Sequence, residues 1–182
     1  MKAPDLTPIE EQLFALSLVS IRQFSDEHPD ESFYGFGIDC MADSGMFLLC
    51  FNSEAAFAET AKEYIERFQY SAADLAALKT NFGDWKYQDF NQDQPHWEAG
   101  WGAYRDAIEA YTFADETEIE EAHAYVEQLM RCACRVLVRI ERSGVFERTN
   151  MDPGFTTAVM DHDESLQEAT VRLNSVRAEF ND

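Results

Sequence analysis

The residues best suited to chemistry lie in and just after the stretch NFGDWKYQDF, residues 81–90. Aromatic rings beside a carboxylate and an imidazole could line a binding cleft, because ligand sites combine apolar surfaces with a few polar groups. The candidate binding residues of this kind are Asp84, Trp85, Tyr87, His96 and Trp97. The alternative is that the rings face inward and pin the loop. Trp97, Trp101 and Tyr104 have the spacing of a buried helix face, which favours the inward arrangement.

Motifs for catalysis or metal binding are absent from the sequence. The four histidines occur in no HxxxH or HExxH arrangement, and no GxSxG nucleophile motif is present. The four cysteines lack the CxxC spacing of zinc sites, which predicts free and mostly buried thiols. Residues 161–164 (DHDE) offer carboxylates and an imidazole, but acidic residues also favour the positive end of a following helix. The sequence therefore predicts no catalytic residue, no metal and no cofactor.

Net charge is the strongest signal in the composition. Fourteen Lys and Arg residues stand against 35 Asp and Glu residues, which gives a formal net charge of −21. Nucleic-acid binding and anionic membranes are both disfavoured, because each requires a basic surface. A basic protein would be attracted at long range, and it is the partner that the sequence predicts.

The acidic residues are densest between Asp106 and Met130, where eight acidic residues occur and no Lys or Arg. This block is interpreted either as a solvated helix face or as a docking face for a basic protein. The residues of the proposed partner face are Asp115, Glu116, Glu118, Glu120, Glu121 and Glu127.

The first element expected to position these residues is a helix of about 20 residues. A capping box at residues 7–10 marks its start, and Pro29 marks its end. Two strands, residues 32–40 and 45–52, form a predicted hairpin. Gly35 and Gly37 fall on one face of the first strand, which indicates that a helix or a bulky ring packs closely there. Further helices are predicted at residues 54–68, from Ser71, and from His96.

The clearest helical pattern is a line of apolar residues from Ile119 to Ile140, three and four positions apart. It predicts a long central helix at residues 117–142, with a capping box at residues 117–120. A third strand at residues 155–161 and a last helix starting at Ser165 complete the chain. The strands cluster rather than alternate with helices, which predicts an α+β fold with a small antiparallel sheet, the hairpin 32–52 plus strand 155–161.

Length and hydropathy indicate a single domain over residues 1–182. No run approaches the ~20 apolar residues that a membrane span needs. The acidic N-terminus, MKAPDLTPIEEQ, lacks the apolar core of a secretion signal, so a cytoplasmic location is expected.

Five segments together resemble the bacterial family catalogued as domain of unknown function 4303: HPDESFYGFGIDC, LLCFNSEAAF, GDWKYQDF, RVLVRIERSGVF and FTTAVMDHDESLQEATVRLN. They occur in the expected order over about residues 28–174. The resemblance implies a small cytosolic bacterial protein. It also implies a genomic setting near toxin or surface-antigen loci, which is shared with the SMI1/KNR4-like immunity proteins. It implies no catalytic residue.

Three hypotheses follow for function. The favoured one is a non-enzymatic acidic module that binds proteins, with an immunity protein against a basic toxin as its specific form. The second is a small-molecule binder or an enzyme that uses the aromatic cleft around Trp85, Tyr87 and Trp97. The third is a homo-oligomeric scaffold joined through the hairpin edge or the long helix. The sequence leaves the oligomeric state open.

Overall fold

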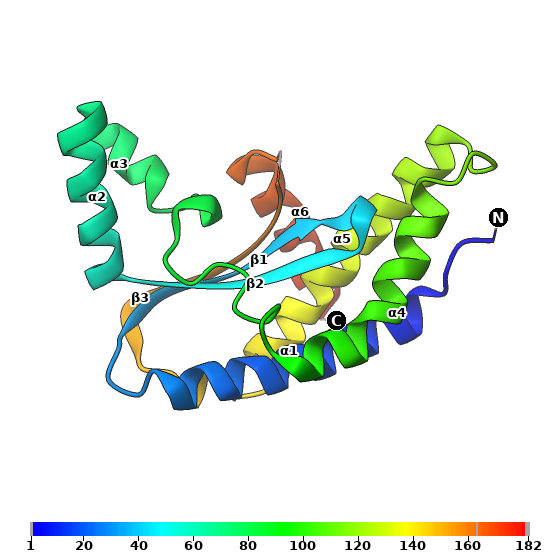
Figure 1. Ribbon diagram of the computed structural model, residues 1–182, viewed down its shortest axis with the longest axis horizontal. Helices are drawn as coiled ribbons and strands as arrows, with labels where there is room; N and C mark the ends of the chain where they lie inside the picture. The colour runs from blue at the N-terminus through cyan, green and yellow to red at the C-terminus, as the bar shows by residue number, and fades with distance from the viewer. Residues whose placement is uncertain (1, 163, 181–182) are drawn as a thin grey trace.

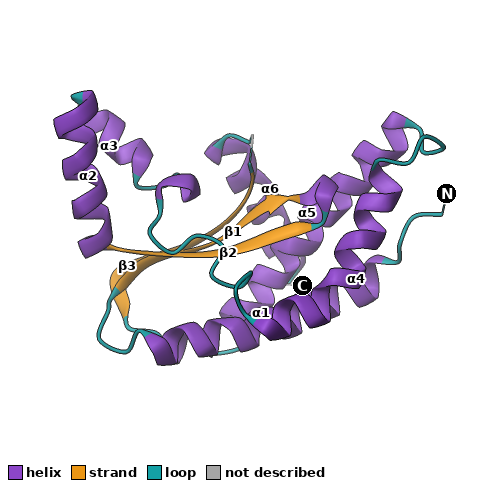
Figure 2. Cartoon of the chain, viewed as in Figure 1, coloured by secondary structure: helices purple, strands orange, loops and turns teal. Residues whose placement is uncertain are grey.

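The computed structural model describes residues 2–162 and 164–180. Within these residues, six α-helices and three strands follow one another (Figures 1 and 2). The elements are α1 (Leu6–Glu27), β1 (Phe33–Met41), β2 (Met46–Ser53), α2 (Glu54–Phe68), α3 (Ala72–Leu78), α4 (Pro95–Thr112), α5 (Ile119–Arg142), β3 (Met151–Asp161) and α6 (Leu166–Glu179). Short 3-10 turns, η1 (Ala42–Ser44), η2 (Phe82–Asp84) and η3 (Val145–Arg148), lie between them.

The three strands form one sheet in the order β2-β1-β3. β1 and β2 make the predicted antiparallel hairpin, with Phe36 opposite Phe51. β3 runs parallel to β1, with Gly35 opposite Thr156. The α+β class is confirmed, but the sheet is mixed and the prediction that it is antiparallel is wrong. The connection from β2 to β3 contains four helices, which is long enough for the crossover that a parallel pair requires.

α1, α4, α5 and α6 contribute the helical side of the main hydrophobic core, against the side of the sheet that carries Phe36, Ile38 and Val159. The predicted apolar line of α5 is buried from Leu129 to Ile140. Its first residue, Ile119, is 69% exposed instead. The first turns of α5 extend past the sheet beside α4, so they have no strand to cover them (Figure 1).

Helix starts were predicted with mixed success. Helices begin after Ser71 and Ser165 as predicted, and each start is a capping box with reciprocal side-chain and backbone hydrogen bonds. At α1 the cap is Asp5, which accepts a hydrogen bond from the backbone N–H of Thr7. At α5 the N-cap is Glu118, whose side chain makes no capping hydrogen bond, so the predicted box at residues 117–120 does not form.

Arginines tie the helices together through ion pairs. Arg135 of α5 lies 2.6 Å from Glu10 of α1, and Arg177 of α6 lies 2.6 Å from Glu141 of α5. Arg139 pairs with Glu11 of α1 in a bidentate geometry. The scarce positive charges of α5 and α6 are therefore used inside the fold, and α5 carries none before Arg131.

No described helix combines the length and the apolar character that are needed to cross a bilayer.

Candidate functional site

Trp85 faces inward, as the clamp hypothesis predicts. Its side chain is 6% exposed and packs against β1 beside Gly35, where an added Cβ would lie 2.9 Å from the ring atom Cη2. The indole Nε1–H donates a hydrogen bond of 3.0 Å to the carbonyl of Lys79. Phe82 covers Gly37 in the same way. The two glycines therefore make room for the two rings that hold η2 against the sheet.

Asp84 and Tyr87 also have structural partners. The hydroxyl of Tyr64 on α2 donates a hydrogen bond to Asp84, and the hydroxyl of Tyr87 donates one to Glu31. The backbone of Tyr87 pairs with that of Phe51 on β2, with N–O distances of 2.9 and 3.3 Å. The polar groups of this loop thus connect it to α2, β2 and the segment before β1.

His96 and Trp97 lie at the start of α4, against α1. The His96 Nε2 is 3.0 Å from the Ser20 hydroxyl, and Trp97 is 1% exposed within the main core. Trp85 belongs to a separate, smaller cluster with Tyr34, Cys50 and Phe82. The five predicted binding residues are therefore divided between two clusters and do not form one cleft.

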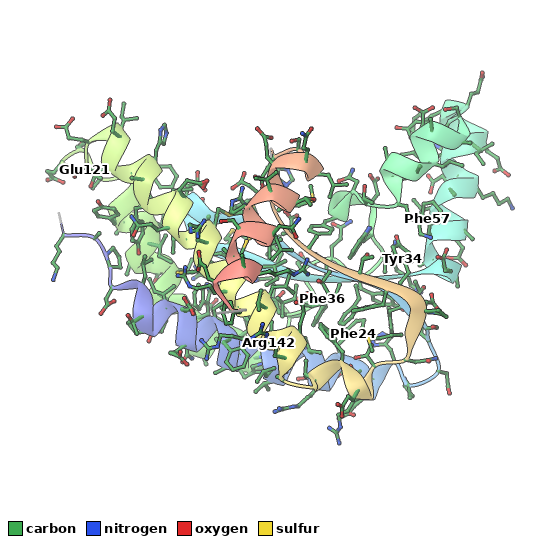
Figure 3. All side chains as sticks on the ribbon, turned by 180° about the vertical axis from the view of Figure 1, so that it is seen from behind. Phe24, Tyr34, Phe36, Phe57, Glu121 and Arg142 are labelled. Carbon is green, nitrogen blue, oxygen red and sulfur yellow. The ribbon has the colours of Figure 1, made fainter. Side chains whose placement is uncertain are left out.

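Trp85 nevertheless lines a hollow of about 470 Å³, here called the β3 cleft. One side is formed by the α3–η2 segment with Lys79, Phe82 and Trp85, and the other by Leu166 and Leu173 of α6. The strand between them is β3 (Figure 3). The sequence did not reveal this cleft, because it depends on the parallel docking of β3, which no local pattern specifies.

The predicted partner face forms a compact projection at the α4–α5 turn (Figures 1 and 3). All six of its residues are exposed, and the five nearest the turn are here called the acidic tip: Asp115, Glu116, Glu118, Glu120 and Glu121. Among the described residues, none of these five carboxylates lies within ion-pair distance of a cation. Glu127 lies farther along α5, 3.8 Å from Arg172. The structure thus brings five residues of the predicted face together and places the sixth near a cation.

Two large apolar side chains are exposed next to the carboxylates of the acidic tip. Phe113, the C-cap residue of α4, is 60% exposed, and Ile119, which begins α5, is 69% exposed. Both line a hollow of about 380 Å³ together with Asp115, His123 and Val126. Sequence reasoning assigned Ile119 to the core line and did not select Phe113.

The comparisons with known proteins identify the family. The model of the family described as domain of unknown function (DUF4303) matches residues 15–175. The chain belongs to the DUF4303 family. No curated protein and no solved structure matches the chain. The predicted resemblance is thereby confirmed over nearly the whole sequence.

The DUF4303 match includes the complete acidic tip and all of β3, so both surfaces belong to the domain itself. Within residues 2–162 and 164–180, no three His, Cys, Asp or Glu side chains are grouped in a way that could hold a metal ion. Of the DHDE stretch, Glu164 pairs with Arg172 and accepts from the Asp161 backbone N–H, while Asp163 lies outside the described residues.

The thiols of this DUF4303 domain are poor nucleophiles. All four cysteines are buried and unbonded to one another. Burial raises the pKa of Cys50 to about 12, and burial is also the main cause that raises the pKa of Cys132 and of Cys134 to about 11. Since the thiolate is the reactive form, these groups are suited to packing rather than to catalysis at neutral pH.

Proposed function

We propose that this DUF4303 protein is a non-catalytic binding module that engages a basic protein partner through its acidic tip. The observation that carries the proposal is the combination, at one projection, of exposed apolar side chains with carboxylates that have no ion pair among the described residues. Protein interfaces commonly join an apolar centre to a polar rim, and Phe113 and Ile119 supply such a centre.

Charge supports the choice of partner. The net charge of −21 draws a basic protein toward the molecule, and the five tip carboxylates form no competing ion pairs among the described residues. Complementary rim charges act mainly on association rate and specificity, whereas desolvated apolar anchors supply most of the affinity. The α4–α5 turn and the adjoining helix ends provide both the rim charges and the apolar anchors.

The finer proposal is an immunity role in the cytoplasm, in which the tip covers the basic surface of a toxin. It draws on the acidic charge and on the genomic setting that the family resemblance implies. An inhibitor of this kind needs no catalytic group, which agrees with the buried thiols and with polar side chains that are occupied by structural hydrogen bonds.

The test is capture of a partner from an extract of the cells that encode the protein, at low and at high salt. A tip variant neutralises three carboxylates, and a control variant neutralises three exposed carboxylates elsewhere. The tip variant is Glu116→Gln, Glu118→Gln and Glu121→Gln. The control is Asp30→Asn, Glu59→Gln and Asp93→Asn. Both have the same net charge, so only position differs.

We expect one basic protein to be retained by the wild type and by the control. Its retention should fall about tenfold with the tip variant, because three exposed ion pairs contribute about 0.5 kcal/mol each. Retention should also fall at about 1 M salt, where the Debye length is about 3 Å. The proposal is wrong if no partner is captured at low salt, or if the tip and control variants retain it equally.

A further inference from the structure

The two edges of the sheet differ in whether another segment of the chain hydrogen-bonds to them. The β2 edge is closed by the segment that follows η2. Phe51 pairs with Tyr87, and the side chain of Asn91 completes the edge. Its Oδ1 accepts from the Leu49 N–H at 2.7 Å, and its Nδ2–H donates to the Phe47 carbonyl at 3.0 Å. Asn91 therefore imitates the backbone of a neighbouring strand.

The β3 edge has no such cover. Among the described residues, no backbone group outside β1 forms a hydrogen bond with the backbone of residues 152–160. Residues 156–160 continue in parallel register with β1, whereas residues 152–155, which include Pro153, form a bulge after Met151. In a parallel pair, every second residue directs its N–H and C=O away from the partner strand, so residues 156–160 present free donors and acceptors. An open edge of this kind is a template for pairing with another chain.

Two hollows lie along β3, and their linings share Thr156, Thr157 and Arg177. The β3 cleft, about 470 Å³, lies against Thr156 and Ala158. A second hollow of about 550 Å³ lies against Met151 and Phe155. Both hollows are lined by consecutive residues of β3, so they offer space for side chains of a strand added at this edge.

We propose that the open edge of β3 binds an extended peptide segment of a partner protein as a fourth strand, with apolar side chains entering the flanking hollows and a Lys or Arg directed at Asp152. Main-chain hydrogen bonds would supply affinity and the hollows would supply side-chain specificity, which is the usual division in strand addition. This site is separate from the acidic tip, and either surface can bind without the other.

The charges around β3 favour a basic segment. Two cations line the hollows, and both are paired: Lys79 lies 2.5 Å from Glu54, and Arg177 lies 2.6 Å from Glu141. Asp152 remains without an ion pair among the described residues. Its Oδ1 accepts from Ser32, and its Oδ2 is buried with no hydrogen-bond partner there. A cationic side chain or a peptide N–H would satisfy this oxygen.

The same observations disfavour a second copy of the chain as the occupant. Two molecules with a charge of −21 each repel one another at moderate salt. β3 also lies between α6 and the α2–α3 corner, so the edges of two copies would have to meet past these helices (Figure 3). A single extended segment faces neither obstacle.

The experiment selects peptides from a phage-displayed library of random dodecapeptides against the immobilised protein, and then measures the affinity of the best peptide as a synthetic compound. We expect apolar residues at alternate positions and at least one Lys or Arg. In a bound peptide, alternate residues direct their backbone N–H groups toward β3 or away from it. N-methylation of the residues whose N–H groups face β3 should abolish binding, whereas N-methylation of the intervening residues should be tolerated.

Two lysine variants locate the site on the protein. Thr156→Lys places a charge beside the open edge, and we expect it to weaken the peptide about tenfold or more. Val171→Lys adds the same charge to α6 at a side chain that is 66% exposed and does not line either hollow. It should change the affinity less than about twofold.

Three outcomes would overturn the proposal. One is a library that yields no binder. Another is a peptide whose affinity is the same whichever alternate set of residues is N-methylated, or the same for the Thr156→Lys and Val171→Lys variants. The third is self-association of the wild type in sedimentation experiments that Thr156→Lys abolishes, which would make a second copy the occupant.

Discussion

Asn91→Ala is expected to lower the free energy of unfolding by about 2–5 kcal/mol. The side chain is fully buried and satisfies one donor and one acceptor of the β2 edge. Removing it leaves the Leu49 N–H and the Phe47 carbonyl without partners, and each buried unsatisfied group costs about 1–3 kcal/mol. Urea denaturation followed by circular dichroism measures the change.

The control for this variant is the neighbouring residue. Gln92→Ala alters a half-buried side chain for which no hydrogen bond is found among the described residues, so its effect should stay within about 0.5 kcal/mol. Equal effects of the two variants would show that Asn91 does not close the β2 edge. The contrast with β3, on which the proposed strand addition depends, would then be lost.

Gly37→Ala is expected to destabilise the fold by about 1–3 kcal/mol, because overpacking forces the surrounding side chains to move. An added Cβ would lie 2.4 Å from Cζ of Phe82, and its neighbouring ring atoms are also within 3 Å. The glycine is required by this close contact, since its φ is not in the left-handed region.

The design for Gly37 includes a second site and a control. In a Phe82→Ala background the ring is gone, so the additional cost of Gly37→Ala should fall below about 0.5 kcal/mol. Gly154→Ala, where nothing lies within 4 Å of the added carbon, should be nearly neutral. If Gly37→Ala costs the same in both backgrounds, Phe82 is not what excludes a side chain at this position.

The sequence was most informative where one contact determines one residue type. The glycines of β1 predicted a closely packed helix or bulky ring, and rings are found there, those of Phe82 and Trp85 from the aromatic stretch itself. The α5 core line was correct from Leu129 onward, because in that part the helix packs against the sheet. Local pattern and tertiary environment agree at these positions.

The sequence was least informative where tertiary arrangement decides. The direction of β3 depends on how four intervening helices return the chain, and no residue within β3 encodes it. The exposure of Ile119 depends on how far α5 extends past the sheet. The tip was found from its charges, whereas its apolar centre and the β3 cleft required the structure.

The central claim is that the acidic tip is the surface that meets a basic partner. The most direct measurement is amide hydrogen exchange of this protein, free and bound to the captured partner. The account predicts slower exchange in residues 113–121 of the bound protein, and loss of that protection in the tip variant at equal partner concentration. Protection confined to other segments, with residues 113–121 unchanged, would contradict it.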